Sequence, residues 1–421
     1  MNDSLAQSLV HQARQVNSSI PEAWIVQEVQ DFRAAQVQVM KAQKSGDLNQ
    51  QIAARKTFFR SKSVKRLAIL VIRNPKDWPD TKYNVDQEII DMTPGAACSE
   101  VVTIKAIAKT SLWQALFAKS HPPLNSSYRL IHSLGRLRKS KNWIADQYLR
   151  LILPIHPSNF LTKGVGIEDF AQATRGFLAK GHKWFVLFDI KDFYGSVQNG
   201  PWLEEATGLK GDLINEEIFT SKDTLLVSQD SEQEHLLKAA QQGLAQGRAT
   251  SSTVAGFLYG KILGDICPAD RCLYYGDDGL IAASSQFEGE AIAHKLKDLL
   301  EHHPAGPFSL SRCELAYAEQ GFEILKYWHK LNKFGGSYLD IGNKSYSRLQ
   351  DRTFDRIVKS GSLESAEEIA ESYLQNWLTS HPSVKITESV VDLAFVAQSD
   401  AIDGANKFLV SKSMKVKPSS A

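Results

Sequence analysis

Three aspartates stand where apolar runs end, and this arrangement is typical of a site for divalent metal ions. Asp189 ends a run that begins at Trp184, and Asp277 and Asp278 follow Tyr275 and a glycine inside a second apolar stretch. Magnesium binds carboxylates together with substrate phosphates. In nucleotidyl transfer, one ion of a pair about 4 Å apart activates a hydroxyl and the other holds the triphosphate. The spacing therefore favours two-metal chemistry on a nucleotide.

The three acids are expected to contribute unequally. Asp189 and Asp277 supply the main ligands if their strands are neighbours, whereas we expect Asp278 on the other face of the pleat or at the turn, as a secondary ligand. Ile190 is placed among the metal ligands as well. A pair of aspartates in a turn is most often only solvated, but here it lies between apolar strands. We expect Asp189, Asp277 and Asp278 to be catalytic, with two Mg²⁺ ions as cofactors and Mn²⁺ as a substitute.

The surrounding pattern predicts how these acids are positioned. Residues 184–189 form a nearly unbroken apolar run, which predicts a buried strand. Residues 272–283 predict a β-hairpin with the acids at its tip, because a glycine permits the tight turn. A helix is predicted over 287–300, followed by strands near Leu310 and at 322–325 that close the unit. The order strand, helix, hairpin, helix, strand predicts a ferredoxin-like sheet.

The remaining sequence predicts mainly helices. Residues 22–72 show helical spacing of apolar positions with a break at 45–47, and residues 75–99 are rich in proline and irregular. Residues 128–154 predict two strands around a basic loop, Arg136 to Lys141, and a helix is expected to start near Ile167. From about residue 345 the chain is expected to be helical, with a loose tail over 404–421. The fold class expected is α+β.

The composition is that of an ordinary globular protein. The 421 residues include 43% hydrophobic and 23% charged residues. We find no apolar run of about 18 residues and no secretion signal, so we expect no membrane association and a cytoplasmic location. The cysteines form no CxxC pair and have no histidine at ligand spacing, which argues against a zinc site or a disulfide framework. The cysteines are Cys98, Cys267, Cys272 and Cys313.

A formal net charge of +2 means that any surface for nucleic acid must be local. Two basic runs lack an intervening acid, and one further lysine precedes the helix near Ile167. An isolated basic run is as often a solvated helix face as a binding surface. The candidates for nucleic-acid binding are Arg55, Lys56, Arg60, Lys62, Lys65, Arg66, Arg136, Arg138, Lys139 and Lys163.

Three segments in order resemble the motifs of reverse transcriptases. Residues 185–197 (FVLFDIKDFYGSV) resemble motif A, residues 243–256 (GLAQGRATSSTVAG) resemble motif B, and residues 275–278 (YGDD) resemble motif C. Residues 163–169 resemble the finger segment before motif A, and residues 321–327 resemble the strand that meets the thumb in group II intron and retron-like enzymes. The resemblance covers roughly residues 22–330.

The resemblance implies roles for residues around the acids. Tyr194 corresponds to an aromatic gate that collides with a ribose 2′-hydroxyl, which implies dNTP over NTP. Gln246 and Gly247 line the nucleotide pocket. Arg150 and Lys141 are candidates for triphosphate contacts, with a plain surface charge an equal alternative. The sequence departs from the family at Ala245 and Gly256, and Arg312 stands where a motif D lysine is usual.

The resemblance also implies a fold and a function. It implies a right-hand polymerase with an N-terminal helical extension (1–99), fingers (100–183), a ferredoxin-like palm (184–330) and a helical thumb-like region (331–421). The spacing within motif B resembles bacterial abortive-infection and other defence-associated enzymes.

The expected function is RNA-directed DNA polymerase that makes cDNA from a dedicated noncoding RNA in antiphage defence. The partners would be an RNA template, dNTPs, the cDNA product, and a second copy of the chain or a second defence protein. Three alternatives stay open: an RNA-templated RNA polymerase, untemplated or protein-primed DNA synthesis, and a non-catalytic RNA-binding relative.

Overall fold

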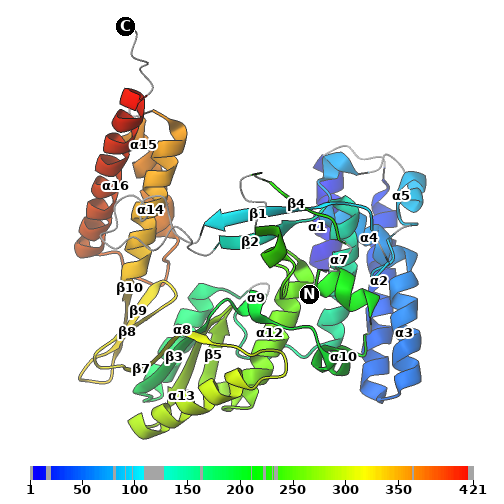
Figure 1. Cartoon of the computed structure of the whole chain (residues 1–421), viewed down its shortest axis with the longest axis horizontal. Coiled ribbons are helices and arrows are strands. Elements are labelled where there is room, and N and C mark those ends of the chain that lie inside the picture. The colour runs from blue at the N-terminus through cyan, green and yellow to red at the C-terminus, as the bar shows by residue number, and fades with distance from the viewer. Residues whose placement is uncertain are drawn as a thin grey trace.

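The computed structural model describes residues 3–15, 20–78, 82–90, 92–96, 98–108, 128–161, 165–209, 211–220, 224–229, 231, 236–362 and 365–415. These residues form a mixed α+β fold with small sheets and many helices (Figure 1). A four-stranded sheet lies low in the view, the N-terminal helices stand to its right, and the C-terminal helices rise at the upper left. No helix among the described residues is long and apolar enough to cross a membrane.

The four-stranded sheet has the predicted ferredoxin-like topology. Its strands are β3 (Trp184–Ile190), β5 (Cys272–Tyr275), β6 (Asp278–Ala283) and β7 (Leu310–Tyr317), in the order β5-β6-β3-β7. Every pair is antiparallel. Helix α12 (Ala249–Gly264) precedes the β5-β6 hairpin, and α13 (Gln286–Glu301) connects it to β7. The predicted buried strand, hairpin and helix are therefore confirmed.

Both faces of β3 are covered, which explains its unbroken apolar run. Val186 and Phe188 pack into a core shared with α12 and α13. Phe185 and Leu187 point to the other face and pack with residues of α8 (Ile167–Ala179), the helix predicted to start near Ile167. Because each alternate residue enters a different core, no position of this strand can be polar until the strand reaches the edge of both cores.

The expectation that residues 322–325 close the same sheet is wrong. They form β8 (Phe322–Ile324), which pairs with β9 (Tyr327–Leu331) in a separate sheet of order β10-β9-β8, where β10 is Ser337–Ile341. Phe322 contacts Phe185 with ring centroids 5.0 Å apart, so β8 packs against a face of the four-stranded sheet. Apolar alternation suits either placement, and the sequence pattern cannot distinguish between them.

The N-terminal region is helical, as predicted. It contains α1 (Asp3–Gln15), α2 (Glu22–Ser45), α3 (Leu48–Arg60) and α4 (Lys62–Ile72). The break predicted at 45–47 is confirmed, and the Asp47 carboxylate caps α3 by accepting from two backbone amides. A second break was not predicted: the Ser61 hydroxyl accepts from the backbone N–H of Val64 and starts α4. Residues 75–99 include the short helices η1 (Pro75–Asp77) and α5 (Lys82–Glu88).

The expected hairpin over 128–154 is wrong in its second half. Strand β2 (Tyr128–Ser133) pairs antiparallel with β1 (Val102–Ala108), which in turn pairs parallel with β4 (Leu226–Ser228). The basic segment and the predicted second strand together form one helix, α7 (Arg136–Ile152). Its apolar positions, including Ile144, Tyr148 and Leu149, are buried at helical spacing against the N-terminal helices.

The C-terminal region is helical, as predicted, but its last helix is longer than expected. It contains α14 (Asn343–Ser360), α15 (Ala366–Thr379) and α16 (Glu388–Lys415). Ala401 and Ala405 are fully buried against Phe354 and Ile357 of α14, and the helix continues beyond residue 404 to Lys415. Residues 416–421 lie outside the described residues. The remaining short elements are α9 (Phe193–Ser196), α10 (Pro201–Thr207), η2 (Ile214–Ile218), α11 (Leu237–Ala240) and η4 (Ala269–Arg271).

Candidate active site

Asp189 and Asp278 face each other across neighbouring strands. In the β3-β6 register they are direct partners, and partners in an antiparallel pair present their side chains on the same face. Of the two positions expected for Asp278, the other face of the pleat is wrong, because the face depends on a register that the sequence does not reveal; Asp278 directly follows the turn, as the first residue of β6. The side chains of both acids lie on the same face of the sheet as Leu187 and Leu280. The helices α12 and α13 cover the opposite face.

Asp277 occupies the two-residue turn between β5 and β6. Gly276 precedes it with φ +67°, a value that glycine adopts without steric cost. The backbone carbonyl of Asp277 accepts from the Tyr259 hydroxyl at 2.9 Å and from the Ile190 N–H at 3.4 Å. The side chain of Ile190 is fully buried. Ile190 and Tyr259 thus fix the turn that carries Asp277 beside the end of β3.

Ser311 holds Asp189 from the other neighbouring strand. Its hydroxyl donates to a carboxylate oxygen of Asp189 and lies 3.2 Å from the Asp189 backbone carbonyl. The register between β3 and β7 shifts at Asp189 and Ile190, and this irregularity accompanies the contact. Ser311 was not among the predicted site residues. The only feature of the sequence that could have identified Ser311 is its position in the strand predicted near Leu310.

The charges of Asp189 and Asp277 act on the Asp278 carboxyl group. Burial, followed by the charges of Asp189 and Asp277, raises the pKa of Asp278 to about 6, and Lys344 and Arg312 oppose the rise. Burial and the charges of the same three acids raise the pKa of Tyr259 well above its usual value. The charges of the acids therefore make ionisation of Asp278 and of Tyr259 less favourable.

The donor chemistry fits a magnesium site. Carboxylate oxygens are the ligands that Mg²⁺ prefers, and a bound cation would offset the repulsion that raises the pKa of Asp278. Within the described part of the chain, no three His, Cys, Asp or Glu side chains already have the arrangement of a metal-ligand cluster. Two effects keep the carboxylates apart when no cation is bound. Ser311 holds the Asp189 carboxylate by a hydrogen bond, and carboxylates of like charge repel one another.

Tyr194 lies beside the acidic group. Burial raises the pKa of Tyr194, a hydrogen bond with Ser252 of α12 opposes the rise, and the charges of Asp277 and Arg129 also act on it. Asp192, two residues earlier, has φ +46° and ψ +46°, a left-handed conformation that is rare outside glycine. This bend ends the straight course of β3 and begins the short helix that carries Tyr194.

The segment 243–247 packs between Tyr194 and β2. The Leu244 N–H donates to the Tyr194 carbonyl at 2.7 Å, and the Gln246 carbonyl accepts from the His132 N–H at 2.7 Å. A Cβ at Gly247, whose φ is +96°, would lie 2.6 Å from the His132 carbonyl oxygen. The segment thus connects the Tyr194 backbone, through Leu244, to β2, through Gln246; a role of Gln246 and Gly247 in a nucleotide pocket stays a prediction.

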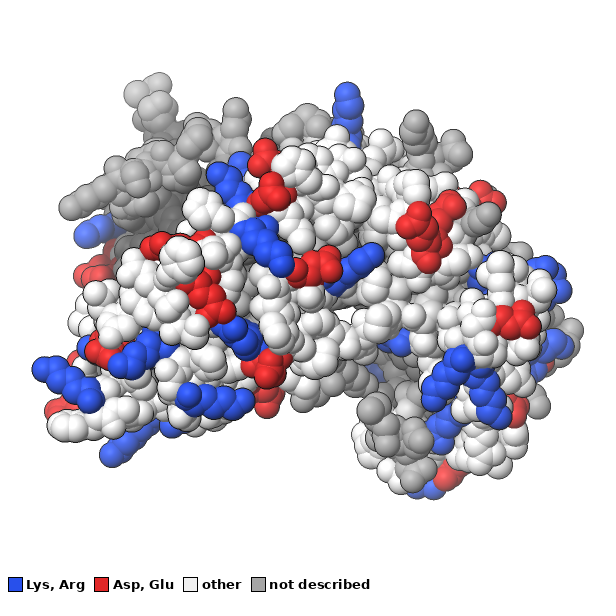
Figure 2. All heavy atoms as spheres, turned by 90° about the horizontal axis from the view of Figure 1, so that it is seen from below, with Lys and Arg blue, Asp and Glu red and all other residues white. Residues whose placement is uncertain are grey.

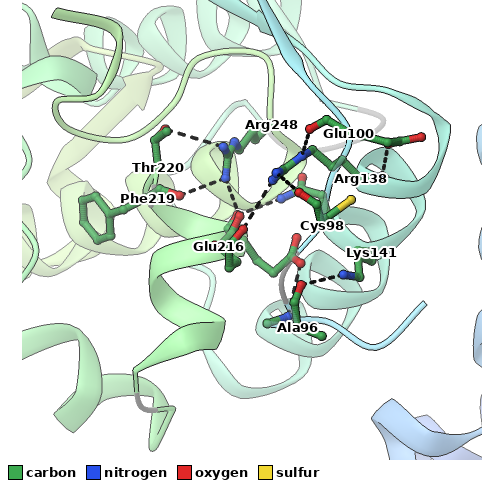
Figure 3. Close-up of polar contacts among 12 residues, drawn as sticks. Ala96, Cys98, Glu100, Arg138, Lys141, Glu216, Phe219, Thr220 and Arg248 are labelled. Carbon is green, nitrogen blue, oxygen red and sulfur yellow. Dashed lines mark hydrogen bonds and ion pairs between the residues drawn. The ribbon is translucent and has the colours of Figure 1, made fainter. Parts of the chain in front are cut away.

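Arg248 anchors this segment from behind through a buried polar network (Figure 3). Its guanidinium donates to the carbonyls of Glu216 at 2.6 Å and Phe219 at 2.9 Å. Burial lowers the pKa of Arg248 to about 10, with the charge of Glu217 acting in the opposite direction. The Asn142 side chain accepts from the Ala249 N–H at 2.9 Å. The start of α12 is therefore fixed to η2 by the Arg248 side chain and to α7 by the Asn142 side chain.

The expected triphosphate contact from Lys141 is wrong. Lys141 lies on α7 with 2% of its surface exposed, and its ammonium donates to the Ala96 carbonyl at 2.6 Å (Figure 3). Its charge already has a buried partner, and no surface remains for a phosphate. Arg150 is more exposed and forms an ion pair with Asp146, one turn earlier, at 2.7 Å. It lines a small cavity with Ser252 and Thr253 of α12.

Several basic residues expected to bind nucleic acid are occupied inside the protein. Arg138 is buried and donates to the carbonyls of Cys98 at 2.6 Å and Glu100 at 2.7 Å (Figure 3). Arg66 forms ion pairs with Glu28 and Asp86, both at 2.6 Å. For Arg138 and Arg66 the expectation is wrong, because their charges are compensated within the fold.

The other basic candidates lie in more accessible places. Arg55 donates to the Gly208 carbonyl at 2.5 Å, and Lys65 donates to the Thr93 hydroxyl at 3.4 Å. Lys163 lies outside the described residues. Basic and acidic side chains alternate over the face in Figure 2, in keeping with the net charge of +2. The exposed candidates are Lys56, Arg60, Lys62, Arg136 and Lys139.

The structure brings forward two cations that the sequence analysis did not name. Arg129 on β2 is exposed, and its charge lowers the pKa of Tyr194. In the β1-β2 register, Lys105 lies on the same face of the ribbon as Arg129, because Lys105 pairs with Ile131 and Ile107 pairs with Arg129. In the sequence, each of the two cations stands between apolar residues in a short strand-like run, and this pattern was the signal that could have identified them.

Comparison with known proteins gives little further information. No protein-family profile matches the sequence, and no curated protein matches it. Among solved structures, the chain aligns with telomerase from Candida albicans, solved with the TWJ fragment of telomeric RNA, at 14% identity and a TM-score of 0.33. The alignment covers 77% of this chain and 64% of that chain, which is less than two thirds of its length. A TM-score this low establishes no shared fold.

Proposed function

We propose that the chain is an RNA-directed DNA polymerase whose catalytic acids are Asp189, Asp277 and Asp278. The observation that carries the proposal is the placement of Asp189 opposite Asp278 at one end of the two central strands of a ferredoxin-like sheet, with Asp277 in the adjoining turn. The raised pKa of Asp278, caused first by burial and then by the charges of Asp189 and Asp277, is in keeping with a carboxyl group placed in an acidic site. In this proposal the four-stranded sheet is the palm.

The chain's own residues would divide the work of nucleotidyl transfer. Two Mg²⁺ ions, when bound, would lower the pKa of the primer 3′-hydroxyl and neutralise charge on the triphosphate. Asp189, Asp277 and Asp278 would hold them. Ser311 orients the Asp189 carboxylate by donating a hydrogen bond to it.

The nucleotide itself would lie against Tyr194 and the segment 243–247. Tyr194, held by Ser252, would exclude a ribose 2′-hydroxyl. Gly247 lets this segment pack directly against β2, because a Cβ there would meet the His132 carbonyl oxygen. Arg129 would contact the triphosphate, since its charge acts at Tyr194 and guanidinium groups bind phosphate in bidentate fashion.

The test is incorporation on an RNA template with a DNA primer. Purified protein is supplied with Mg²⁺ and either dNTPs or NTPs, and the extended primer is resolved on a gel. We expect template-dependent extension with dNTPs, and little with NTPs. Preference for NTPs would overturn the proposal in favour of an RNA polymerase, and extension that ignores the template sequence would overturn it in favour of untemplated synthesis.

The resemblance of the sequence motifs to defence-associated enzymes extends the proposal to a role. We infer that the protein copies a dedicated noncoding RNA into cDNA in bacterial antiphage defence, in the cytoplasm. Sequencing of the nucleic acids that co-purify with the protein from cells tests this role. One enriched RNA together with cDNA of matching sequence is expected, and recovery of neither would contradict it.

A further inference from the structure

Two of the four cysteines, Cys267 and Cys272, stand on either side of a tight turn. Cys267 follows shortly after the end of α12, and Cys272 is the first residue of β5. The turn between them is closed by the Arg271 N–H, which donates to the Pro268 carbonyl at 3.0 Å. Such a turn brings the ends of its four residues within about 7 Å of each other, so the residues that flank it also lie close together.

The sulfur of Cys272 lies against the chain at Cys267. Cys272 Sγ is 3.8 Å from the carbonyl oxygen of Pro268, the residue that follows Cys267. A hydrogen bond between the two thiols, followed by burial, raises the pKa of Cys267. Both side chains are buried, and both thiols are free. The turn thus places two reduced sulfur atoms within hydrogen-bonding reach of each other.

The two thiols are not equivalent. The hydrogen bond from Cys267 lowers the pKa of Cys272, burial opposes this fall, and a hydrogen bond from Ser158 adds to it. The Ser158 hydroxyl oxygen lies 3.3 Å from Cys272 Sγ. The thiolate, and not the thiol, is the form of cysteine that attacks an oxidant. Cys272 is therefore the sulfur that reacts first, and Cys267 is the thiol that stands beside it.

The pair lacks the further ligands of a metal centre. A structural zinc site takes four ligands, most often cysteine and histidine. Within the part of the chain that the structure describes, no three His, Cys, Asp or Glu side chains are grouped as metal ligands. The remaining cysteines lie elsewhere in the fold, because Cys98 precedes α7 and Cys313 belongs to β7. Two adjacent thiols without further ligands are suited to oxidation rather than to metal binding.

We propose that Cys267 and Cys272 are an oxidation site, at which hydrogen peroxide produces an intramolecular disulfide between the end of α12 and β5. The Cys272 thiolate attacks one peroxide oxygen, the O–O bond breaks, and a sulfenic acid and hydroxide form. The Cys267 thiol then attacks the Cys272 sulfur, the S–S bond forms, and the S–O bond breaks with release of water. In total, two thiols and one peroxide give one disulfide and two molecules of water.

The disulfide would join two elements that are already packed together. Two residues after Cys272, the Tyr274 hydroxyl donates to the Gly256 carbonyl of α12 at 2.7 Å. The Tyr274 ring stacks on Tyr259 of the same helix, with ring centroids 4.7 Å apart. A covalent link beside these contacts restricts the unfolded chain, and this restriction stabilises the folded state. Oxidation would therefore strengthen the attachment of α12 to the strand that leads to Asp277.

Peptide mapping of the full-length protein tests the proposal. Reduced protein is treated with a graded series of hydrogen peroxide concentrations, free thiols are alkylated, and trypsin digestion follows without reduction. Because trypsin cleaves after Arg271, residues 262–271 and 272–295 stay together as one species only when the disulfide joins them. Mass spectrometry should show this linked species growing with peroxide and disappearing after treatment with dithiothreitol.

Variants identify the sulfur atoms that react. Cys98→Ala/Cys313→Ala should form the linked species as the wild type does. In Cys267→Ala, the sulfenic acid at Cys272 has no thiol to react with and should be trapped by dimedone. Circular dichroism confirms that each variant is folded, and the wild type and the double variant decide the question if Cys267→Ala does not fold. Recovery of Cys267 and Cys272 as alkylated thiols while Cys313 is oxidised overturns the inference, and so does linkage of either residue to Cys98, to Cys313 or to a second copy.

Urea denaturation tests the effect of the bond on the fold. The oxidised wild type should unfold at a higher urea concentration than the reduced protein, whereas peroxide should give no such increase in Cys267→Ala. An unchanged or lower midpoint for the oxidised wild type would overturn the stabilising link. These measurements need no nucleotide addition, so failure of primer extension and failure of disulfide formation are separate results.

Discussion

Asparagine in place of Asp278 should stabilise the protein when divalent ions are absent. The pKa of Asp278 is raised from 3.8 to about 6 by burial and by Asp189 and Asp277. A difference of about two pKa units corresponds to about 3 kcal/mol, and solvent screening at this half-buried site reduces it to about 1–3 kcal/mol. The neutral amide has nearly the same shape and removes this cost.

The sign of the effect fixes its pH dependence. Because the folded protein holds the Asp278 proton more tightly than the unfolded chain does, the wild type loses stability as pH rises from 3.8 to about 6. Above that range the full cost applies, and below it both proteins are neutral at this position. The advantage of Asp278→Asn should therefore be present at about pH 8 and should vanish towards about pH 4.

Chemical denaturation in a chelating buffer at several pH values measures the difference in the free energy of unfolding. Asp212→Asn, an exposed aspartate of the same type, is the control and should change little. Adding Mg²⁺ should then stabilise the wild type more than Asp278→Asn, because a ligand that binds the folded state stabilises it. Equal stability of wild type and Asp278→Asn at about pH 8, or an advantage that grows towards acid pH, would refute the reasoning.

Three further predictions concern residues around the acids. Ser311→Ala should lower kcat about tenfold with the KM for dNTP unchanged and should raise the Mg²⁺ concentration required, whereas Ser311→Thr should restore both; steady-state kinetics and metal titration by calorimetry decide this. Arg248→Ala should destabilise the fold by about 3 kcal/mol or more, because buried carbonyls and Glu217 lose their partner; thermal denaturation measures it, and a change below about 1 kcal/mol would count against the network. Tyr194→Ala should raise NTP incorporation relative to dNTP by about 10- to 100-fold, and an unchanged ratio in competition assays would remove Tyr194 from sugar selection.

The sheet that carries the acids could be predicted because its strands have an unambiguous pattern. The apolar run of β3 reflects two cores, and glycine before Asp277 permits a two-residue turn. The side on which Asp278 lies could not be predicted, because it depends on the register between β3 and β6. The contact from Ser311 depends on a second register, with an irregularity at Asp189.

The basic segment at the start of α7 shows a different limit of sequence reasoning. Its charges suggested an exposed loop between strands, yet Arg138 and Lys141 are buried and donate to backbone carbonyls from residues 96–100. Those carbonyls belong to an irregular segment whose location relative to α7 is set by tertiary packing. A charge that is compensated by a distant backbone cannot be distinguished from a solvated one in sequence.

The central claim is that Asp189, Asp277 and Asp278 together catalyse metal-dependent nucleotide addition, and primer extension by Asp277→Ala tests it most directly. Wild type, Asp277→Ala and the surface control Asp212→Ala are compared on the same RNA template over a range of Mg²⁺ concentrations. Wild type and control should extend the primer in proportion to bound Mg²⁺, and Asp277→Ala should show no extension at any concentration while remaining folded. Full extension by Asp277→Ala would contradict the account.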